Sequence, residues 1–450
     1  MTIPIRSLGA RRFLAVIIVL LAIALLTGAL TIPFIFESPS MWYKFGLDKT
    51  SLRIGKMIGL TAGVLILLQL VLAGRFKFLD RVFSMPGLIR QHRIHAWVIV
   101  VLALLHPALV LYAEKMLMLP LDVRYWPEWV GVGLWIIILL QFIGSQWRLR
   151  MGIAFHVWMI LHRIGGLLIA ALLIVHVLYV SESFTDNRIP GMAVIVAGAV
   201  FGMTWLWVRS GWLRARRRPY AVNTVETTGT DATCVTLGPL TQKPFAYRPG
   251  QFAIVSFRSP HIGAEAHPFT LSSSPGRDRT LAFTIRACGD WTRRVGRLQP
   301  GDKALIQGPF GRFGHLFTEP GRELILIAGG IGITPMLSML RFLADAADTR
   351  PVSLVWSNRT RQHIVHGEEM ERLAAKLTGL RWIPIFTREP NGDPSAGRLD
   401  RDRLSAILSP CSRQAAVYLC GPPAMMTQLK QDLIALGFPS RSIYTEAFGF

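Results

Sequence analysis

Apolar and polar positions divide the chain into a front part of long apolar runs and a back part of short alternating ones. A helix of about 20 apolar residues is long enough to cross the hydrocarbon of a membrane. Such runs lie at 13–35, 57–74, 94–113, 129–145, 158–180 and 191–208. We therefore expect six spanning helices. The first follows basic residues, as a signal peptide does, but it is longer than a signal core and lacks a clean A-x-A site, so we expect it to be retained.

The pattern changes to short strand-like runs broken by turns from Tyr220 to about Pro309. Alternation of this kind predicts a small antiparallel β-barrel. After Pro320, strand-like runs such as LILIA and VSLVWS alternate with helical segments, which predicts an α/β domain with a parallel sheet. The expected architecture is multi-domain: an all-α six-helix bundle, a β-barrel and an α/β domain. We place these domains at 1–212, 213–320 and 321–450.

Two of the spanning runs contain the same phrase. Residues 92–106 read HRIHAWVIVVLALLH, and residues 162–176 read HRIGGLLIAALLIVH. Fourteen residues of helix stop about 40° short of four turns and rise about 21 Å, so the two histidines of each phrase face one way, near opposite ends of the span. Ionisable residues inside a membrane are costly, and they usually serve a pathway or a cofactor.

Metal binding is the natural reason for these histidines. Two facing helices would pair His92 with His162 and His106 with His176. Two stacked two-histidine sites suit two b-type haems, with both axial positions of each iron filled. Buried polar contacts between helices are the alternative interpretation.

The net charge of +22 is distributed in a way that argues against nucleic-acid binding. Basic residues gather at alternate ends of the spans, and the positive-inside rule then places both termini in the cytoplasm. This orientation makes His92 and His162 the inner pair, and His106 and His176 the outer pair. We expect a multi-pass protein of the plasma (inner) membrane.

Arg93 and Arg163 each follow an inner histidine directly. There they can meet the propionates of a haem, or lipid headgroups instead. The chain has four cysteines, all in the back half and without a C-x-x-C spacing, which favours cytoplasmic thiols over disulfides or zinc. They are Cys234, Cys288, Cys411 and Cys420.

Four segments of the predicted barrel carry a recognisable order. They are RPGQF at 248–252, HPFTLSSSP at 267–275, IRACGDWT at 285–292 and GPFG at 308–311. In this order they resemble the ferredoxin-reductase-type flavoproteins, and HPFT is most similar to their membrane-bound relatives, the NADPH oxidases and ferric reductases. Arginine and glycine amides suit phosphate.

The resemblance implies that these segments bind FAD. Residues 267–275 would line the isoalloxazine, with Thr270 hydrogen-bonding the ring, and residues 285–292 and 308–311 would bind the diphosphate. The residues assigned to FAD are Arg248, Pro249, Gly250, Gln251, His267, Pro268, Phe269, Thr270, Arg286, Gly289, Asp290, Trp291, Thr292, Gly308 and Gly311.

The α/β part contains a glycine turn, LILIAGGIGITP, between a strand and a helix. Phosphate can bind the free amides at such a helix start. We expect Thr334 to cap this helix and Pro335 to take its first position. Arg359 ends the second strand and is placed for the 2′-phosphate of NADP; a solvated loop charge is the alternative. The glycines of the turn are Gly329, Gly330 and Gly332.

The last segments resemble the nicotinamide end of the same family. In YLCGPPAMM, the resemblance places Cys420 near the reacting carbon, next to Gly421 and Pro422. In EAFGF, it implies a catalytic role for Glu446 and an aromatic ring that covers the flavin until nicotinamide displaces it. Either Phe448 or Phe450 can supply that ring.

The resemblance covers nearly the whole chain and implies a path for electron transfer across the membrane. NADPH would reduce FAD, and single electrons would pass through the inner and then the outer haem to an acceptor outside. We expect oxygen, giving superoxide at the haem edge. A ferric or cupric chelate is the first alternative, and electron donation to a separate periplasmic protein is the second.

Two features depart from what the family leads us to expect. Between the haems, where some members set an aromatic ring, the helices offer Ile99, Leu168 and Ile169. No calcium-binding loop or long tail precedes the first span. We therefore expect activity without an obligatory activating subunit.

Overall fold

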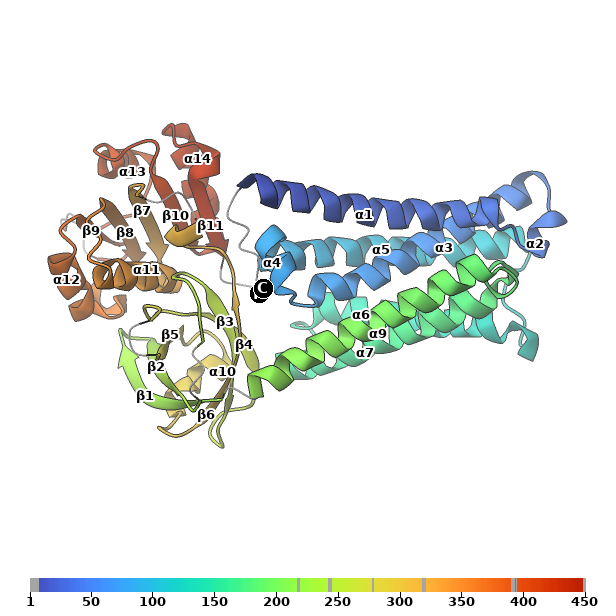
Figure 1. The fold of residues 1–450 in the computed structure, drawn as a ribbon, viewed down its shortest axis with the longest axis horizontal. Coiled ribbons are helices and arrows are strands. Elements are labelled where there is room, and N and C mark those ends of the chain that lie inside the picture. Colours follow the sequence, from blue (N-terminus) through green and yellow to red (C-terminus); the bar gives the residue numbers. More distant parts are fainter. Residues whose placement is uncertain are drawn as a thin grey trace. The chain divides into compact units, whose positions relative to one another are not determined.

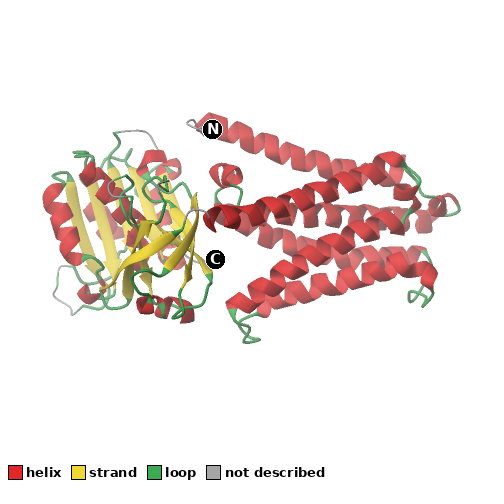
Figure 2. Cartoon of the chain, turned by 60° about the horizontal axis from the view of Figure 1, so that its bottom comes forward, coloured by secondary structure: helices red, strands yellow, loops and turns green. Residues whose placement is uncertain are grey.

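The computed structural model describes residues 8–216, 219–241, 245–276, 279–317, 321–389, 393 and 395–447. The chain forms two compact units, Met1–Ser210 and Gly211–Phe450. Within the described residues, the first unit is built from helices and all strands lie in the second (Figure 2).

Six helices of the first unit are long and apolar enough to cross a membrane, as predicted. In Figure 1 the long helices of this unit run along one common direction. Large apolar side chains such as Leu21, Val101 and Ile164 are exposed on their outer surfaces, which suits contact with lipid. The long helices are α1 (Leu8–Ile35), α3 (Gly46–Ala73), α5 (Met85–Ala113), α6 (Trp126–Trp147), α7 (Phe155–Val180) and α9 (Arg188–Arg216). Short helices in the connections are α2 (Pro39–Trp42), α4 (Lys77–Phe83), η1 (Val123–Tyr125) and α8 (Glu182–Thr185).

The core of the bundle lies among α3, α5, α6 and α7. Its buried side chains are all aliphatic, and they come from the middle of each helix. Aliphatic packing of this kind separates the histidines near the two ends of the helices. The buried cluster is Leu65, Ile66, Ile99, Leu134, Ile138, Ile169 and Leu173.

The first part of the second unit is a six-stranded antiparallel sheet in the order β4-β3-β6-β1-β2-β5. Beyond β4, the amide of Ser272 donates to the carbonyl of Ala282 (2.8 Å), which brings the two edges together and closes the barrel. The helix α10 (Asp290–Arg293) follows β5. The strands are β1 (Tyr220–Thr228), β2 (Ala232–Pro239), β3 (Phe252–Arg258), β4 (Ala266–Thr270), β5 (Leu281–Arg286) and β6 (Lys303–Phe310).

The second part is a five-stranded parallel sheet in the order β11-β10-β7-β8-β9, with helices between the strands. Its strands are β7 (Leu324–Gly329), β8 (Val352–Asn358), β9 (Leu380–Phe386), β10 (Ala416–Gly421) and β11 (Ile443–Ala447). Its helices are α11 (Ile333–Asp345), α12 (Gly367–Lys376), α13 (Arg401–Leu408) and α14 (Pro423–Ala435).

The predicted fold class is therefore confirmed: six apolar helices, an antiparallel barrel and a parallel α/β sheet. Sequence patterning did not identify β4, β11 or α13 as elements. Strand β4 contains the HPFT segment, whose polar ends hide its alternation, and β11 lies next to the chain's last residues.

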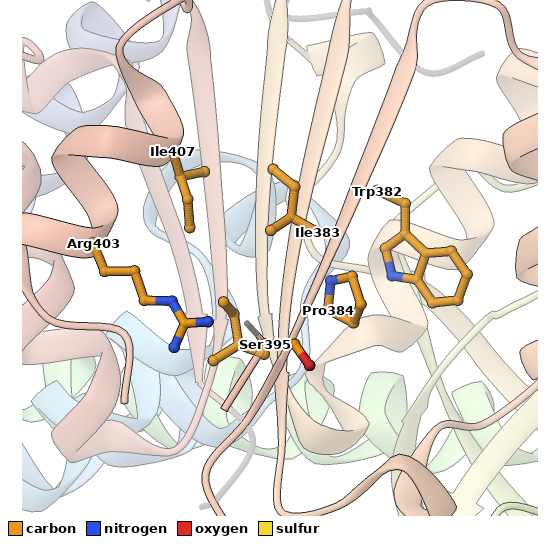
Figure 3. Close-up of a pocket in the computed structure, with 7 residues that line it drawn as sticks. Trp382, Ile383, Pro384, Ser395, Arg403 and Ile407 are labelled. Atoms are coloured by element: carbon orange, nitrogen blue, oxygen red, sulfur yellow. The ribbon is translucent and has the colours of Figure 1, made fainter. Parts of the chain in front are cut away.

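A pocket of about 320 Å³ opens beside the edge strand β9 and α13 (Figure 3). Apart from Ser395 and Arg403 its lining is apolar, and the guanidinium of Arg403 donates to the carbonyl of Ala396 (2.6 Å). None of the residues predicted to bind a cofactor lines this pocket. The lining residues are Trp382, Ile383, Pro384, Ile385, Ser395, Arg403 and Ile407.

Candidate cofactor sites

The four histidines of the repeated phrase meet in two pairs inside the bundle. The ring centroids of His92 and His162 are 6.1 Å apart, with planes inclined by 68°. Those of His106 and His176 are 6.3 Å apart, with planes inclined by 81°. Helices α5 and α7 thus face each other as the phrase predicts.

This spacing fits two imidazoles that share one metal. A metal–imidazole bond is about 2 Å long, and the ring centre lies about 1 Å further, so the centroids of two such rings are about 6 Å apart. No group of three or more His, Cys, Asp or Glu side chains that could hold a metal occurs in the described part of the chain. Two-histidine sites of this kind suit an iron whose other four ligands come from a porphyrin.

The outer pair has the tautomer that such a role requires. Nδ1 of His106 donates to the carbonyl of Gly55 (2.8 Å), and Nδ1 of His176 donates to the carbonyl of Pro127 (2.9 Å). A neutral imidazole that donates through Nδ1 keeps its lone pair on Nε2. Both rings therefore keep Nε2 unprotonated, in the state that can ligate a metal.

The inner pair is held through the backbone instead. The side-chain amide of Gln69 donates to the carbonyl of His92 (3.0 Å), and that of Gln141 donates to the carbonyl of His162 (3.1 Å). Sequence analysis missed both glutamines. Each lies on the helix that packs against its histidine helix, so only the pairing of α3 with α5 and of α6 with α7 reveals them.

Other bundle residues occupy less specific positions. Arg93 and Arg163 are exposed, as either propionate or lipid contact requires. Of the residues expected between the haems, Ile99 and Ile169 are buried in the aliphatic core, whereas the side chain of Leu168 is 44% exposed.

The predicted flavin segments meet at one side of the barrel. The turn at 248–251 packs on residues 311–314: a Cβ on Gly250 would stand 1.9 Å from the carbonyl oxygen of Phe313, and the φ of Gly250 is +83°. Gln251 donates to the carbonyl of Gly311 (2.9 Å). Only glycine allows this close approach, so the RPGQ and GPFG segments form one surface, as a shared ligand requires.

Thr270 provides a direct test of the expected flavin contact. Its hydroxyl is buried and has no hydrogen-bond partner among the described residues. A buried polar atom without a partner is costly, so a bound ring that hydrogen-bonds this oxygen would remove the cost. The residues present therefore fit a flavin at this place.

His267 and Phe269 lie beside it in an aromatic stack with Trp291, whose ring centroid is 4.4 Å from that of His267 and 5.9 Å from that of Phe269. His267 is also hydrogen-bonded to Glu265 (3.1 Å), and burial lowers its pKa. Alternate side chains of a strand point to opposite faces, so this aromatic stack lies on the face of β4 opposite to Pro268.

The segment predicted to bind the diphosphate is held in its turn by hydrogen bonds to its own threonine. The amides of Cys288 and Gly289 both donate to the hydroxyl of Thr292 (3.0 and 2.8 Å), and Asp290 opens α10 with an exposed carboxylate. The segment thus presents a tight turn whose backbone is held from within.

Arg286 lies between the two halves of this unit. Its guanidinium is ion-paired with Asp231 (2.6 Å), and a Cβ on Gly330 would stand 2.9 Å from it. The arginine assigned to FAD by resemblance therefore also lies against the glycine turn of the α/β part, within reach of a second nucleotide.

The glycine turn packs directly on the end of β10. A Cβ on Gly332 would stand 2.3 Å from the carbonyl oxygen of Cys420, and one on Gly329 would stand 2.7 Å from Pro422. Gly421 in turn would meet Gly329 at 3.0 Å. Because these glycines have no side chains, the two segments can pack closely against each other.

The prediction that Thr334 caps this helix is wrong. A 3₁₀ turn, η4 (Gly330–Gly332), runs straight into α11, which begins at Ile333 with Gly332 before it. Thr334 is therefore already inside the helix, and its hydroxyl donates backwards to the carbonyl of Ile331 (3.1 Å). Arg359 follows β8 and is exposed, in the position expected for it.

Cys420 and Glu446 are neighbours across β10 and β11, where they are register partners. Burial, and the adjacent carboxylate, raise the pKa of the Cys420 thiol well above its usual value. Glu446 also approaches the flavin surface, since a Cβ on Gly311 would stand 3.4 Å from its carboxylate. Phe448 and Phe450 lie outside the described residues.

Family comparisons agree with this arrangement. Residues 58–175 match the ferric reductase like transmembrane component, residues 220–310 an FAD-binding domain, and residues 326–431 the oxidoreductase NAD-binding domain. These matches, with the fold, define a transmembrane electron-transfer oxidoreductase that binds a flavin and a nicotinamide nucleotide. The chain belongs to the NADPH oxidase and ferric reductase family, with a C-terminal half of ferredoxin–NADP reductase type.

Individual relatives match slightly less than half of this chain. The chain is 27% identical to the glycine betaine monooxygenase reductase subunit of Chromohalobacter salexigens, over 46% of this chain and 57% of that protein. It is 30% identical to the sulfhydrogenase 1 subunit gamma of Pyrococcus furiosus, over 46% of this chain and 70% of that protein. A ferredoxin reductase component of 3-ketosteroid-9-alpha-monooxygenase from Mycobacterium tuberculosis is 30% identical, over 45% of this chain and 55% of that one. The chain thus spans little more than half the length of two of these three relatives.

Two solved structures are similar at lower identity. The FAD/NAD-binding domain of nitric oxide dioxygenase from Vibrio cholerae is 22% identical, covers 52% of this chain and 99% of that one, and has a TM-score of 0.45. A flavohemoglobin from Malassezia yamatoensis is 18% identical, covers 90% of this chain and 98% of that one, and has a TM-score of 0.48.

Proposed function

We propose that this protein is a transmembrane NADPH oxidase, which moves electrons from NADPH through FAD and two haems to a one-electron acceptor on the opposite side of the membrane. The two histidine pairs carry this proposal, because centroid separations of 6.1 and 6.3 Å are those of imidazoles sharing a metal. FAD, when bound, accepts a hydride and releases electrons singly, which is the form that haem iron takes.

The chain's own residues would bind and orient these groups. His92 and His162 would hold the inner haem, and His106 and His176 the outer one. Thr270 would donate its free hydroxyl to the isoalloxazine. At the end of β10, the glycine turn would receive the nicotinamide, with the thiol of Cys420 buried and protonated behind it.

Arg359 would supply positive charge for the nucleotides, and Arg286, which is ion-paired with Asp231 (2.6 Å), would supply hydrogen-bond donors. Arg286 lies against the glycine turn, and exposed Arg359 follows the neighbouring strand, as recognition of a 2′-phosphate requires. We propose the three domains at 1–212, 213–320 and 321–450, with both termini cytoplasmic and the bundle in the plasma (inner) membrane. Basic residues concentrated at the inner helix ends support this orientation.

We propose oxygen as the acceptor, with superoxide as the product. If His106 and His176 both hold the outer haem, its iron would have no free position, and oxygen would be reduced at the haem edge. The connections on the outer side are short, which leaves room for a small acceptor. No obligatory activating subunit is expected.

A metal chelate is the second candidate, and ion pairing weakens it. Two of the outer cations that could attract an anionic chelate form ion pairs at the surface: Lys115 with Asp48 (3.0 Å) and Arg124 with Asp122 (2.8 Å). Electron donation to a separate periplasmic protein is the third candidate. The relatives named as reductase subunits favour it, since a reductase subunit works with a partner.

The test uses purified full-length protein loaded with FAD and haem. NADPH oxidation is measured in air and without oxygen, with a superoxide trap, and then anaerobically with a ferric chelate. We expect oxygen-dependent turnover with about two superoxide per NADPH. Undiminished anaerobic chelate reduction, with no superoxide in air, would overturn the proposed acceptor. The electron path itself is tested by haem content: His106→Ala or His176→Ala should leave one haem.

A further inference from the structure

Each ring of the outer pair lies against a glycine on the neighbouring helix. A Cβ on Gly59 would stand 2.7 Å from Nδ1 and 2.8 Å from Cε1 of His106. A Cβ on Gly131 would stand 2.5 Å from Cε1 and 2.8 Å from Nδ1 of His176. Separations below 3 Å are too short for a carbon atom, so any side chain at either position would displace the imidazole.

The same glycines lie one helical turn after the carbonyls that the rings bind. Gly59 comes four residues after Gly55, and Gly131 four residues after Pro127. In a helix, residues four apart share one face. A ring that donates to the first carbonyl must therefore cover the residue one turn later, and glycine there leaves the room.

The arrangement occurs twice, on α3 against α5 and on α6 against α7. It is specific to the outer pair. Nδ1 of His92 is buried without a hydrogen-bond partner among the described residues, and Nδ1 of His162 faces only the hydroxyl of Ser145 at 3.5 Å. A chance packing contact would not be expected to recur at both outer rings with the same donor, acceptor and spacing.

We propose that Gly59 and Gly131 are positioning residues for His106 and His176. By leaving the ring site open, each glycine lets Nδ1–H reach a backbone carbonyl, which fixes the tautomer and aims Nε2 at a shared iron. An imidazole that donates a hydrogen bond is a stronger ligand, and its metal favours the oxidised state. The glycines thereby lower the potential of the outer haem. This inference rests on the proposed haem ligation.

The test compares four alanine variants of the full-length protein. Gly59→Ala and Gly131→Ala fill the ring sites. Gly63→Ala and Gly133→Ala are matched controls on the same two helices, because a Cβ at Gly63 meets Leu173 at an ordinary 3.5 Å and one at Gly133 meets nothing within 4 Å. Alanine is the better helix former, so loss of helix propensity cannot explain a defect.

Haem per chain, low-spin ferric resonance and a redox titration are the measurements. We expect the controls to keep about two haems. Each test variant should lose one haem, or keep it with one altered low-spin signal and one raised midpoint potential, while the other haem is unchanged. Test variants that match the controls, or that lose both haems together, would overturn the inference. Absence of two low-spin haems in the unaltered protein would instead count against the proposed function.

Discussion

Glu369 on α12 accepts both arms of the guanidinium of Arg341 on α11, at 2.7 and 2.6 Å. The third contact of Arg341 is to the barrel, where it donates to the carbonyl of Ser272 (2.7 Å), two residues beyond Thr270. One arginine therefore fixes the α/β part to the segment expected to line the flavin.

Replacing this arginine tests that connection. Lysine keeps the charge of Arg341 but cannot make the paired contact, so Arg341→Lys should destabilise the C-terminal unit by about 1–2 kcal/mol. Urea unfolding of the full-length protein, followed by flavin fluorescence, measures the change. Arg372→Lys is the control, since Arg372 forms an exposed pair with Glu368 on the same helix. Equal midpoints for the two variants would show that Arg341 contributes no more than a surface pair.

Stability should fall in mild acid because of His366. Burial and the charge of Arg341 lower its pKa to about 4. Since the unfolded value is near 6.5, the unfolded chain binds more protons between these limits, and stability is lost as the pH falls from about 6.5 to about 4, by roughly 1–3 kcal/mol. The pKa of Glu369 is also lowered, by Arg341, so its protonation adds to the loss at the acid end.

The variant His366→Asn should flatten this pH dependence. His366 has a left-handed backbone with φ of +53°, which asparagine tolerates. A residual slope is expected from His315, whose pKa burial also lowers to about 4. Exposed His261→Asn is the control. The measurement is the urea midpoint from pH 4.5 to 7.5, and an unchanged slope in His366→Asn would contradict the prediction.

Thr270→Val should leave the stability of the protein without FAD unchanged or raised, and it should lower the affinity for FAD. Removing a buried hydroxyl that has no partner should leave the apoprotein as stable as before or stabilise it by up to about 1 kcal/mol. FAD should bind about five- to tenfold more weakly, because the ring loses a hydrogen bond. Thermal unfolding of the apoprotein and titration with FAD measure the two effects.

The control for this experiment is Thr284→Val. The hydroxyl of Thr284 is hydrogen-bonded to His366 (3.0 Å), so its removal should destabilise the fold and leave FAD affinity unchanged. Unaltered FAD binding in Thr270→Val would refute the expected ring contact.

Cysteine alkylation should select Cys288 at neutral pH. Cys288 is exposed, whereas Cys234, Cys411 and Cys420 are buried and their pKa values are raised by burial. Iodoacetamide should modify Cys288 at least about tenfold faster than the others, as thiolate and access decide the rate. Mass spectrometry after timed quenching gives the rates, with Cys288→Ser as the control. FAD should slow the reaction, and early labelling of Cys420 would show that the β10 end opens.

Sequence was most informative where a pattern repeats or a motif is local. The spans and five of the six barrel strands follow from periodicity, and the four histidines follow from a repeated motif. Contacts between distant segments did not follow. Gln69 and Gln141 depend on which helices pair, and the meeting of Arg286 with Asp231 depends on barrel register. The prediction for Thr334 was wrong because the helix α11 begins two residues earlier than expected, after a 3₁₀ turn, so that Thr334 lies inside the helix and Gly332 precedes it.

On the proposed electron path, the aliphatic core between the two histidine pairs would determine what crosses the membrane with the electrons. Its members are leucine and isoleucine, which carry no exchangeable proton, so this layer would pass electrons without protons. In the proposed reaction the proton from NADPH stays inside while negative charge leaves. Turnover would be electrogenic: it acidifies the cytoplasm and depolarises the membrane. Each electron moving outward across an inside-negative potential gains about 2.3 kcal/mol per 100 mV, so the membrane voltage itself would drive this protein.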